Sequence, residues 1–234
     1  MAAETQVLLD TEKKYIAKFF SDADESDVKK VDLSTLSWAK HTITLSGAAS
    51  PNFKIGEVLT VGAEKYLVTG FTAGASTVEV VGWDNTNKKA TAIDASSSNG
   101  DAVSGGVSGN NTRTYSSIAE QDFNVLVTKI MWICNGLQVA IEWDGSGSEA
   151  YIAELIANGI WSMPAMEWPG IGINASGDSG NVLGDIQFST TGHASGDSYT
   201  VIMELKKQSG YDIPAYEQNN ILGYPVDYLL GNFT

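Results

Sequence analysis

The sequence is poor in the residue types that build several common classes of site. It holds one cysteine, Cys134, among 234 residues, and only one arginine. A single cysteine excludes an internal disulfide framework and a cysteine-rich zinc site. The 14 basic residues stand against 28 acidic ones, which gives a formal net charge of −14. This balance argues against a protein that wraps nucleic acid, because phosphate binding needs clustered lysines and arginines.

Long hydrophobic runs are also absent. The longest uncharged, apolar-rich stretch runs from Ile130 to Ile141, well short of the roughly 20 residues that a membrane-spanning helix needs. The first ten residues have neither the basic region nor the apolar core of a signal peptide. We therefore expect a soluble protein made in a cytoplasm, with no membrane partner.

Glycine and apolar side chains are what the chain has in quantity. Glycine occurs 24 times, hydrophobic residues make up 43% and charged residues 18%. The apolar fraction is too high for a wholly disordered chain, and the combination favours an all-β or loop-rich globule. The length suits one large domain or two small ones.

The charge is unevenly distributed along the chain. Between Ile130 and Leu205 there are nine acidic residues and no basic one, while the bases lie mainly in the first 129 residues. The simpler interpretation is a solvated acidic surface that keeps the protein in solution. The alternative is complementarity between the two parts of neighbouring copies in an assembly.

The clearest periodic pattern lies in the second half of the chain. Residues 137–144 alternate between apolar and polar side chains, which predicts a strand with one buried and one solvated face. A longer apolar strand at 123–134 precedes it, and Asn135-Gly136 predicts a tight hairpin between the two. Further strands are expected at 13–21, 28–33, 185–190 and 198–206. Together they predict an antiparallel β-sandwich of jelly-roll type.

A small β module is expected as an insertion in this sandwich. Alternating and β-branched segments between 37 and 93 predict four or five short strands. In the stretch 94–112 that follows, Ser, Gly and Asn supply 12 of 19 residues, which predicts a flexible surface linker. The sandwich itself is then expected to be formed by residues 1–36 and 113–234.

One segment, 149–158, fits two kinds of element. A three-turn helix is slightly favoured, with Ser148 as its N-cap and Gly159 just after its last turn. The apolar residues between Tyr151 and Leu155 also alternate, so a strand stays open as the alternative.

The chain after Tyr211 is too rich in turn residues for a strand or a helix. It nevertheless carries four aromatic residues, Tyr216, Tyr224, Tyr228 and Phe233. A tail of this composition usually docks on another surface, which is either its own domain or a neighbouring subunit.

The most prominent catalytic motif is Gly-Asp-Ser-Gly around Ser179, which resembles the nucleophile region of chymotrypsin-like proteases. His41 and Asp101 precede it in the order of that family's triad. We reject a protease because Asp101 lies in the Ser/Gly/Asn-rich stretch, where nothing would hold a carboxylate buried. His41 also lacks the Ala-Ala-His-Cys context of that family. The sequence Ala-Ser-Gly-Asp-Ser occurs twice, at 175–179 and 194–198, which is typical of turns.

No other group of residues points to catalysis or metal binding. His41, His193 and Cys134 are far apart in the sequence, and Cys134 is expected to be a small core residue. The segment 144–149 resembles a calcium loop only faintly, since position twelve holds Leu155 in place of a bidentate Glu. We expect a non-enzymatic protein with no catalytic, cofactor-binding or metal-ligating residues and no cofactor.

The six tryptophans allow a different function. Such rings can stack on sugars in carbohydrate-binding modules, but core or interface positions are favoured for Trp143 and for at least some of the others. They stand at Trp38, Trp83, Trp132, Trp143, Trp161 and Trp168.

Several stretches together resemble a family of small structural proteins from tailed phages, especially marine phages and cyanophages. The resemblance covers roughly residues 7–36 and 123–207, and residues 53–60 are also similar to the small β inserts of phage virion proteins. The stretches that carry it are 28–36, 129–132, 137–144, 184–192 and 196–207.

The resemblance implies a non-enzymatic virion component, and we expect a capsid decoration (cement) protein on the exterior of the phage head. Its expected partners are the major capsid protein, other virion proteins and further copies of itself, with a trimer as the form suited to capsid symmetry axes. Strong acidity would keep it off packaged DNA. The alternatives are a tail, neck or baseplate component, or a carbohydrate-binding module for attachment to the host.

Overall fold

The computed structural model describes residues 3–46, 53–72, 75–93, 99–104, 114–120, 123–145, 150–163, 170–172, 182–208 and 210–211. These residues form antiparallel strands and one short 3-10 helix, Leu33–Thr35, so the predicted all-β fold is confirmed. The chain divides into two compact units. The sandwich unit comprises Met1–Leu33 and Phe123–Ser209, and the barrel unit comprises Ser34–Asp122 and Gly210–Thr234.

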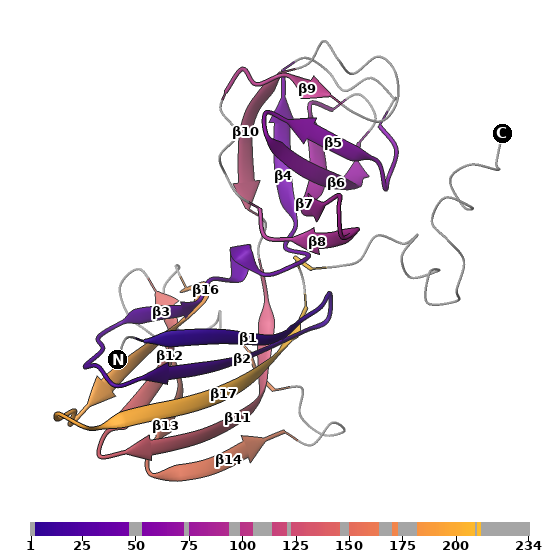
Figure 1. The fold of residues 1–234 in the computed structure, drawn as a ribbon. Coiled ribbons are helices and arrows are strands. Elements are labelled where there is room, and N and C mark those ends of the chain that lie inside the picture. Colours follow the sequence, from indigo (N-terminus) through magenta and orange to yellow (C-terminus); the bar gives the residue numbers. More distant parts are fainter. Residues whose placement is uncertain are drawn as a thin grey trace. The chain divides into compact units, whose positions relative to one another are not determined.

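The sandwich unit contains two antiparallel sheets (Figure 1). The first sheet has the order β1-β2-β17-β11-β14, with β15 also paired to β11, and the second has the order β13-β12-β16-β3. The strands of the first sheet are β1 Glu4–Asp10, β2 Lys14–Ser21, β17 Ser198–Lys207, β11 Val125–Asn135, β14 Asn158–Ser162 and β15 Ile171–Gly172. Those of the second are β13 Ala150–Leu155, β12 Gln138–Gly145, β16 Val182–Thr191 and β3 Val28–Val31.

Strict alternation of side chains builds the core between these sheets. Strands β2 and β17 bury every second residue, as the period of two requires for a sheet with one covered face. Phe19 of β2 meets Phe188 of β16 edge-on, with ring centroids 5.2 Å apart. Phe188 in turn lies 6.0 Å from the ring of Tyr199 on β17, so aromatic contacts join the two sheets directly.

The two strands flanking Asn135-Gly136 are present, but the predicted hairpin between them is wrong. Strand β11 pairs with β14, β15 and β17, whereas β12 pairs with β13 and β16. The turn therefore carries the chain from one sheet to the other. An Asn-Gly pair indicates that the chain reverses direction, but it does not show that the two flanking strands pair with each other. Here β11 pairs along its length with β17 and β12 with β16, and these two partners are each ten residues long.

The N-terminal strands include one that was not predicted. The predicted strand at 28–33 is present as β3 Val28–Val31, and it joins β16 in the second sheet. Strand β2 pairs with β17 and with β1, and β1 is an element that the sequence pattern did not indicate. Residues 7–9 of β1 are apolar but exposed, so they lack the alternation that marks a half-buried strand.

The slightly favoured helix at 149–158 is wrong, and the alternative of a strand is confirmed. Two strands, β13 and β14, occupy this region, and Ala157 turns between them with a φ of 56°. Leu155 pairs with Val139 of β12 and is 2% exposed. Pairing with β12 satisfies backbone groups and buries Leu155 at once, which outweighs the local preference for a helix.

The barrel unit is a second, independent β structure. Its sheet has the order β10-β4-β7-β6-β5-β9, with β8 added to β7. Ala102 bridges Thr114, and the Tyr115 amide donates to the Asp101 carbonyl at 2.8 Å, so residues next to β9 join those next to β10 and close the sheet on itself. The strands are β4 His41–Leu45, β5 Val58–Val61, β6 Glu64–Phe71, β7 Thr77–Asp84, β8 Lys89–Thr91, β9 Val103–Ser104 and β10 Tyr115–Glu120.

These pairings differ from the expected boundaries of the inserted module. Strand β9 falls within the predicted linker 94–112, and β10 falls within the stretch assigned to the sandwich. Val103 and Tyr115 are 1% and 5% exposed and belong to the barrel core. The Ser/Gly/Asn-rich composition hides the two-residue strand β9, because one apolar side chain gives no periodic signal. The insertion therefore lies between β3 and β11 of the sandwich and includes β9 and β10.

The turn between the sheets gives a first prediction. Gly136 has a φ of 81°, and a Cβ there would collide with the Asp197 carboxylate, which accepts a hydrogen bond from the Ala194 amide at 2.8 Å. Gly192 has a φ of 78° with open space around it. Gly192→Ala should cost about 1 kcal/mol for backbone strain, and Gly136→Ala should cost about 1 kcal/mol more for the displaced hydrogen bond. Urea unfolding measures both, and equal losses would contradict this packing of the turn.

Candidate functional site

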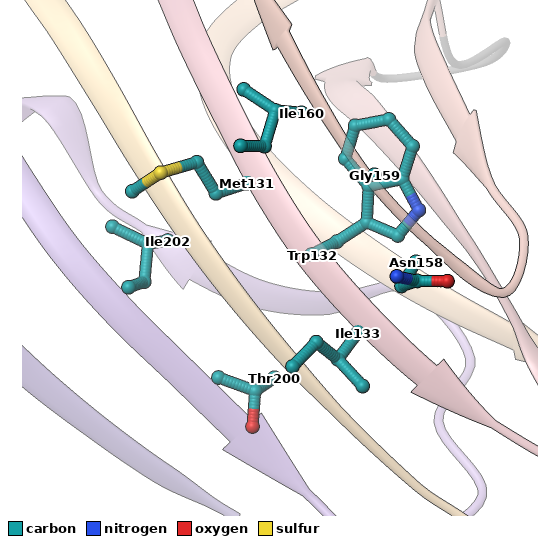
Figure 2. Close-up of a pocket in the computed structure, with 8 residues that line it drawn as sticks. All are labelled: Met131, Trp132, Ile133, Asn158, Gly159, Ile160, Thr200 and Ile202. Atoms are coloured by element: carbon teal, nitrogen blue, oxygen red, sulfur yellow. The ribbon is translucent and has the colours of Figure 1, made fainter.

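An open hollow of about 310 Å³ lies on the outer side of the first sheet (Figure 2). It is lined by residues of β11, β14 and β17. Six of them share the outward face of the sheet, whereas Trp132 pairs with the buried Val201 and its side chain lies on the other face. Its volume is at the lower end of the range for ligand sites. The lining residues are Met131, Trp132, Ile133, Asn158, Gly159, Ile160, Thr200 and Ile202.

The centre of this surface is apolar and open to solvent. Met131 pairs with Ile160 on one side and with Ile202 on the other, so the three side chains form one row across the sheet. Ile133 and Ile160 are 62% and 69% exposed. We call Met131, Ile133, Ile160 and Ile202 the outer apolar face. Contiguous exposed apolar side chains of this kind mark interaction surfaces more often than isolated ones do.

Trp132 borders the hollow, and its ring is held in place. Its indole nitrogen donates a hydrogen bond to the Ile156 carbonyl at 3.1 Å. Its ring lies against Gly159 on the paired strand, where any side chain would collide with it. The ring is therefore fixed, and its nitrogen is already used within the protein.

Lysines surround the outer apolar face. Lys14 and Lys18 occupy outward positions of β2, Lys129 lies on β11 and Lys206 on β17. Two carboxylates share these outward rows, Glu204 opposite Lys129 and Glu4 opposite Phe20. Four lysines and two glutamates give this surface a formal positive excess in a chain whose net charge is −14.

Glu204 is tied into this surface by two donors. The Lys14 ammonium lies 3.0 Å from its carboxylate, and the Thr128 hydroxyl donates to the same oxygen at 3.0 Å. Partial burial alone would raise the pKa of Glu204, but the hydrogen bonds from Lys14 and Thr128 outweigh it and hold the pKa below its ordinary value. The carboxylate therefore stays ionised and fixes Lys14 at the border of the face.

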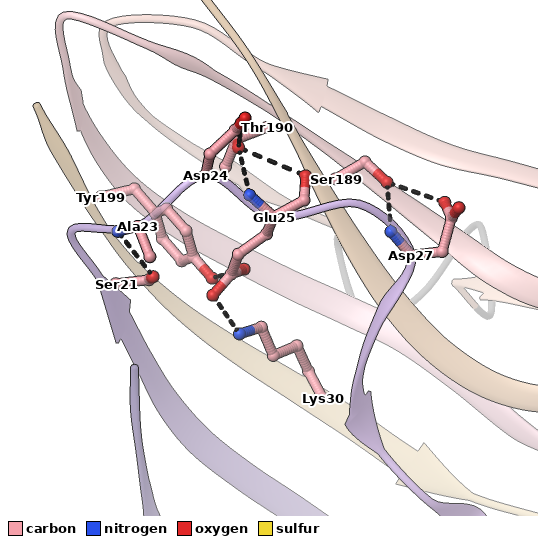
Figure 3. A network of polar contacts seen from close by, with 9 residues as sticks. All are labelled: Ser21, Ala23, Asp24, Glu25, Asp27, Lys30, Ser189, Thr190 and Tyr199. Atoms are coloured by element: carbon pink, nitrogen blue, oxygen red, sulfur yellow. Dashed lines mark hydrogen bonds and ion pairs between the residues drawn. The ribbon is translucent and has the colours of Figure 1, made fainter. Parts of the chain in front are cut away.

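A buried ion pair fastens the segment that crosses between the two sheets (Figure 3). The Glu25 carboxylate accepts hydrogen bonds from the Lys30 ammonium and the Tyr199 hydroxyl, each at 2.7 Å. The side chains of Lys30 and Glu25 are 5% and 4% exposed. Burial, together with the hydrogen bond to Glu25, raises the pKa of Tyr199 well above its ordinary value. All three groups are satisfied by one another, which indicates a structural network.

The same segment is also fastened to the end of β16. The Glu25 amide donates to the Thr190 hydroxyl at 2.8 Å, and the Asp27 amide donates to the Ser189 hydroxyl at 2.9 Å. These contacts hold the residues just before β3 against β16, and β3 then pairs with β16 at the edge of the second sheet.

Comparison with protein families, with curated proteins and with solved structures finds no match for this chain.

The residues of the rejected protease triad do not form a site among the described residues. His41 is buried in β4 with its Nδ1 3.2 Å from the Ala39 carbonyl oxygen. Asp101 lies in the segment that closes the barrel, where its side chain faces Gly62. Ser179 lies outside the described residues, as do most of the residues of the calcium-loop candidate after Asp144.

The remaining candidates have structural positions. Cys134 is buried, as predicted, and burial raises the pKa of its thiol, which makes it a poor nucleophile. No cluster of three potential metal ligands occurs within the described part of the chain. Trp143 is 1% exposed, which confirms its predicted core position. Trp38 and Trp83 pack on a small cluster in the barrel unit, and Trp168 lies outside the described residues.

No helix in the described part of the chain is both long enough and apolar enough to cross a membrane.

The buried pair gives a second prediction. Lys30→Met would leave the Glu25 carboxylate buried without its cation, which typically costs about 3–5 kcal/mol of unfolding free energy. The matched control is Lys13→Met on an exposed lysine, for which a change within about 0.5 kcal/mol is expected. Denaturant unfolding measures both variants. A loss below about 1 kcal/mol for Lys30→Met would contradict a dependence of the fold on this pair.

Glu204 gives a third prediction, on pH. Its pKa is lowered from the ordinary value of 4.5 in the folded state. Its carboxylate therefore stabilises the fold above that pH, and the contribution is lost as the pH falls through the lower, folded-state value. The difference in unfolding free energy between the wild type and Glu204→Gln should shrink as the pH falls from about 6 to about 3. A difference that stays constant over this range would contradict the assigned contacts.

Proposed function

We propose that this protein is a non-enzymatic structural component of a tailed-phage virion, and that it is a capsid decoration protein on the exterior of the head. The structural observation that supports the proposal is the order of the sandwich strands. The edge strand β1 and the two-residue β15 are left out of this order. The eight remaining strands of the sandwich are β2, β3, β11, β12, β13, β14, β16 and β17. Numbered along the chain, these eight pair in the order 1-8-3-6 in one sheet and 2-7-4-5 in the other.

This order supports a jelly roll, in which two Greek keys are wound around one core. Jelly rolls are common among viral capsid and lectin domains. Because one fold serves many functions, the fold alone does not select the virion. The selection comes from the resemblance of residues 7–36 and 123–207 to structural proteins of tailed phages.

Two further features favour the exterior of the head. A formal charge of −14 disfavours contact with packaged DNA and suits a surface that faces solvent. The outer apolar face leaves a surface available for a protein neighbour, and a decoration protein acts through such surfaces. The expected partners are the major capsid protein and further copies of this chain.

The proposal is tested on purified virions of the phage that encodes the chain. Quantitative mass spectrometry should find hundreds of copies per particle, and antibodies against the protein should label heads. A count of about a dozen or fewer, with label at the neck or baseplate, would instead favour the tail, neck or baseplate alternative. Absence from purified particles would contradict a virion role altogether.

A carbohydrate-binding role is the second candidate because Trp132, Asn158 and Thr200 are among the residues that line the hollow. An indole ring is a platform on which a sugar ring can stack. Binding on a glycan array that is lost in Trp132→Ala, with the unfolding midpoint unchanged, would favour this candidate over decoration.

A further inference from the structure

The outer apolar face is a surface without a described neighbour, and its chemistry specifies what would fit it. Ile133 and Ile160 are mostly exposed at its centre, and Lys18 and Lys129 lie beside them on the same side of the sheet. An occupant should therefore supply apolar or aromatic side chains together with carboxylates, and few cations.

One segment of this same chain has that composition. Residues 212–234 follow the last described residue, Tyr211, and include the aromatic residues Tyr216, Tyr224, Tyr228 and Phe233. They carry three acidic residues, Asp212, Glu217 and Asp227, and no lysine or arginine. The segment thus matches the face in both apolar character and sign of charge.

The length of the segment is also sufficient. Twenty-three residues reach at most about 75 Å when extended, far more than the width of one sheet. Its origin is fixed, because Tyr211 is 1% exposed and the Gly210 carbonyl accepts a hydrogen bond from the Lys40 amide at 2.9 Å. A segment that starts at an anchored point and exceeds the dimensions of a domain can reach a neighbouring molecule.

We propose that residues 212–234 of one copy bind the outer apolar face of a second copy, so that the protein assembles by exchanging its C-terminal segments. The contact joins two different surfaces, so it is a head-to-tail contact that yields a ring when the rotation between copies closes. Such an exchange would occur in the purified chain whether or not a particle is present, so it goes beyond the proposed function.

Charge-reversal variants of the full-length chain test the contact between the outer apolar face and residues 212–234. The face variant is Lys18→Glu with Lys129→Glu, and the segment variant is Asp212→Lys, Glu217→Lys and Asp227→Lys. Sedimentation velocity should show an oligomer for the wild type and at least tenfold weaker association for each variant. An equimolar mixture of the two variants should associate again, because each then offers the complement of the other.

A matched control separates this effect from net charge. Lys54→Glu with Lys65→Glu changes the net charge equally on exposed lysines of the barrel unit and should leave the mass of the oligomer unchanged. A monomeric wild type would overturn the proposal, and so would face or segment variants that keep the wild-type mass. Circular dichroism verifies that every variant is folded.

Cross-linking gives the independent measurement of the contact itself. A photoreactive phenylalanine at position 160 is placed in an isotopically light chain and mixed with a heavy wild-type chain. Mass spectrometry should find cross-links from the light position 160 to the heavy residues 212–234. Cross-links confined to one copy, or directed to another part of the chain, would overturn the exchange between copies.

Discussion

The packing of two sheets through one shared aromatic core is the interaction on which the rest of the structure depends. Phe19, Phe188 and Tyr199 connect the first sheet to the second, and the Tyr199 hydroxyl extends this contact to the buried pair of Glu25 and Lys30. Because the pair lies at the crossing between β2 and β3, the core and the path of the chain are fixed together. Losing either partner would leave a buried charge that the core cannot solvate.

The sandwich carries a whole second unit in one of its loops, and the chain is fixed locally where it leaves the sandwich. Where the chain leaves the sandwich, the Leu33 amide donates to Asp185 at 2.8 Å, and the Lys29 ammonium contacts the same carboxylate at 2.7 Å. The barrel has its own closed sheet and its own core. An insertion of this kind can add a surface without changing the strands that form the core.

Side-chain periodicity predicted the fold where one face of a strand is buried and the other is wet. The strand at 198–206 was predictable because every second residue is buried. The strand at 137–144 was predictable from the same alternation in the sequence, although Glu142 on its polar side is buried in the structure. The pairing of strands was not predictable from local signals. Asn135-Gly136 indicates that the chain turns, but it does not indicate which strands pair on either side of the turn. Strand β1 was missed because its apolar residues are exposed, and β9 because two residues carry no period.

The candidate surface was predictable only in part. The sequence showed that the bases are concentrated upstream of residue 130, and it showed an aromatic tail. It could not show that Lys14 and Lys18 share a face with Lys129 and Lys206, because that depends on β17 lying between β2 and β11. Exposure of Ile133 and Ile160 likewise depends on which side of the sheet the second sheet covers.

A reconstruction of the purified virion by cryo-electron microscopy tests the central claim most directly. The account predicts density for the two-sheet sandwich on the outside of the head, with the outer apolar face covered by residues 212–234 of a neighbouring copy. Density for this protein only in the tail, or a sandwich on the head whose outer apolar face is open to solvent, would contradict it.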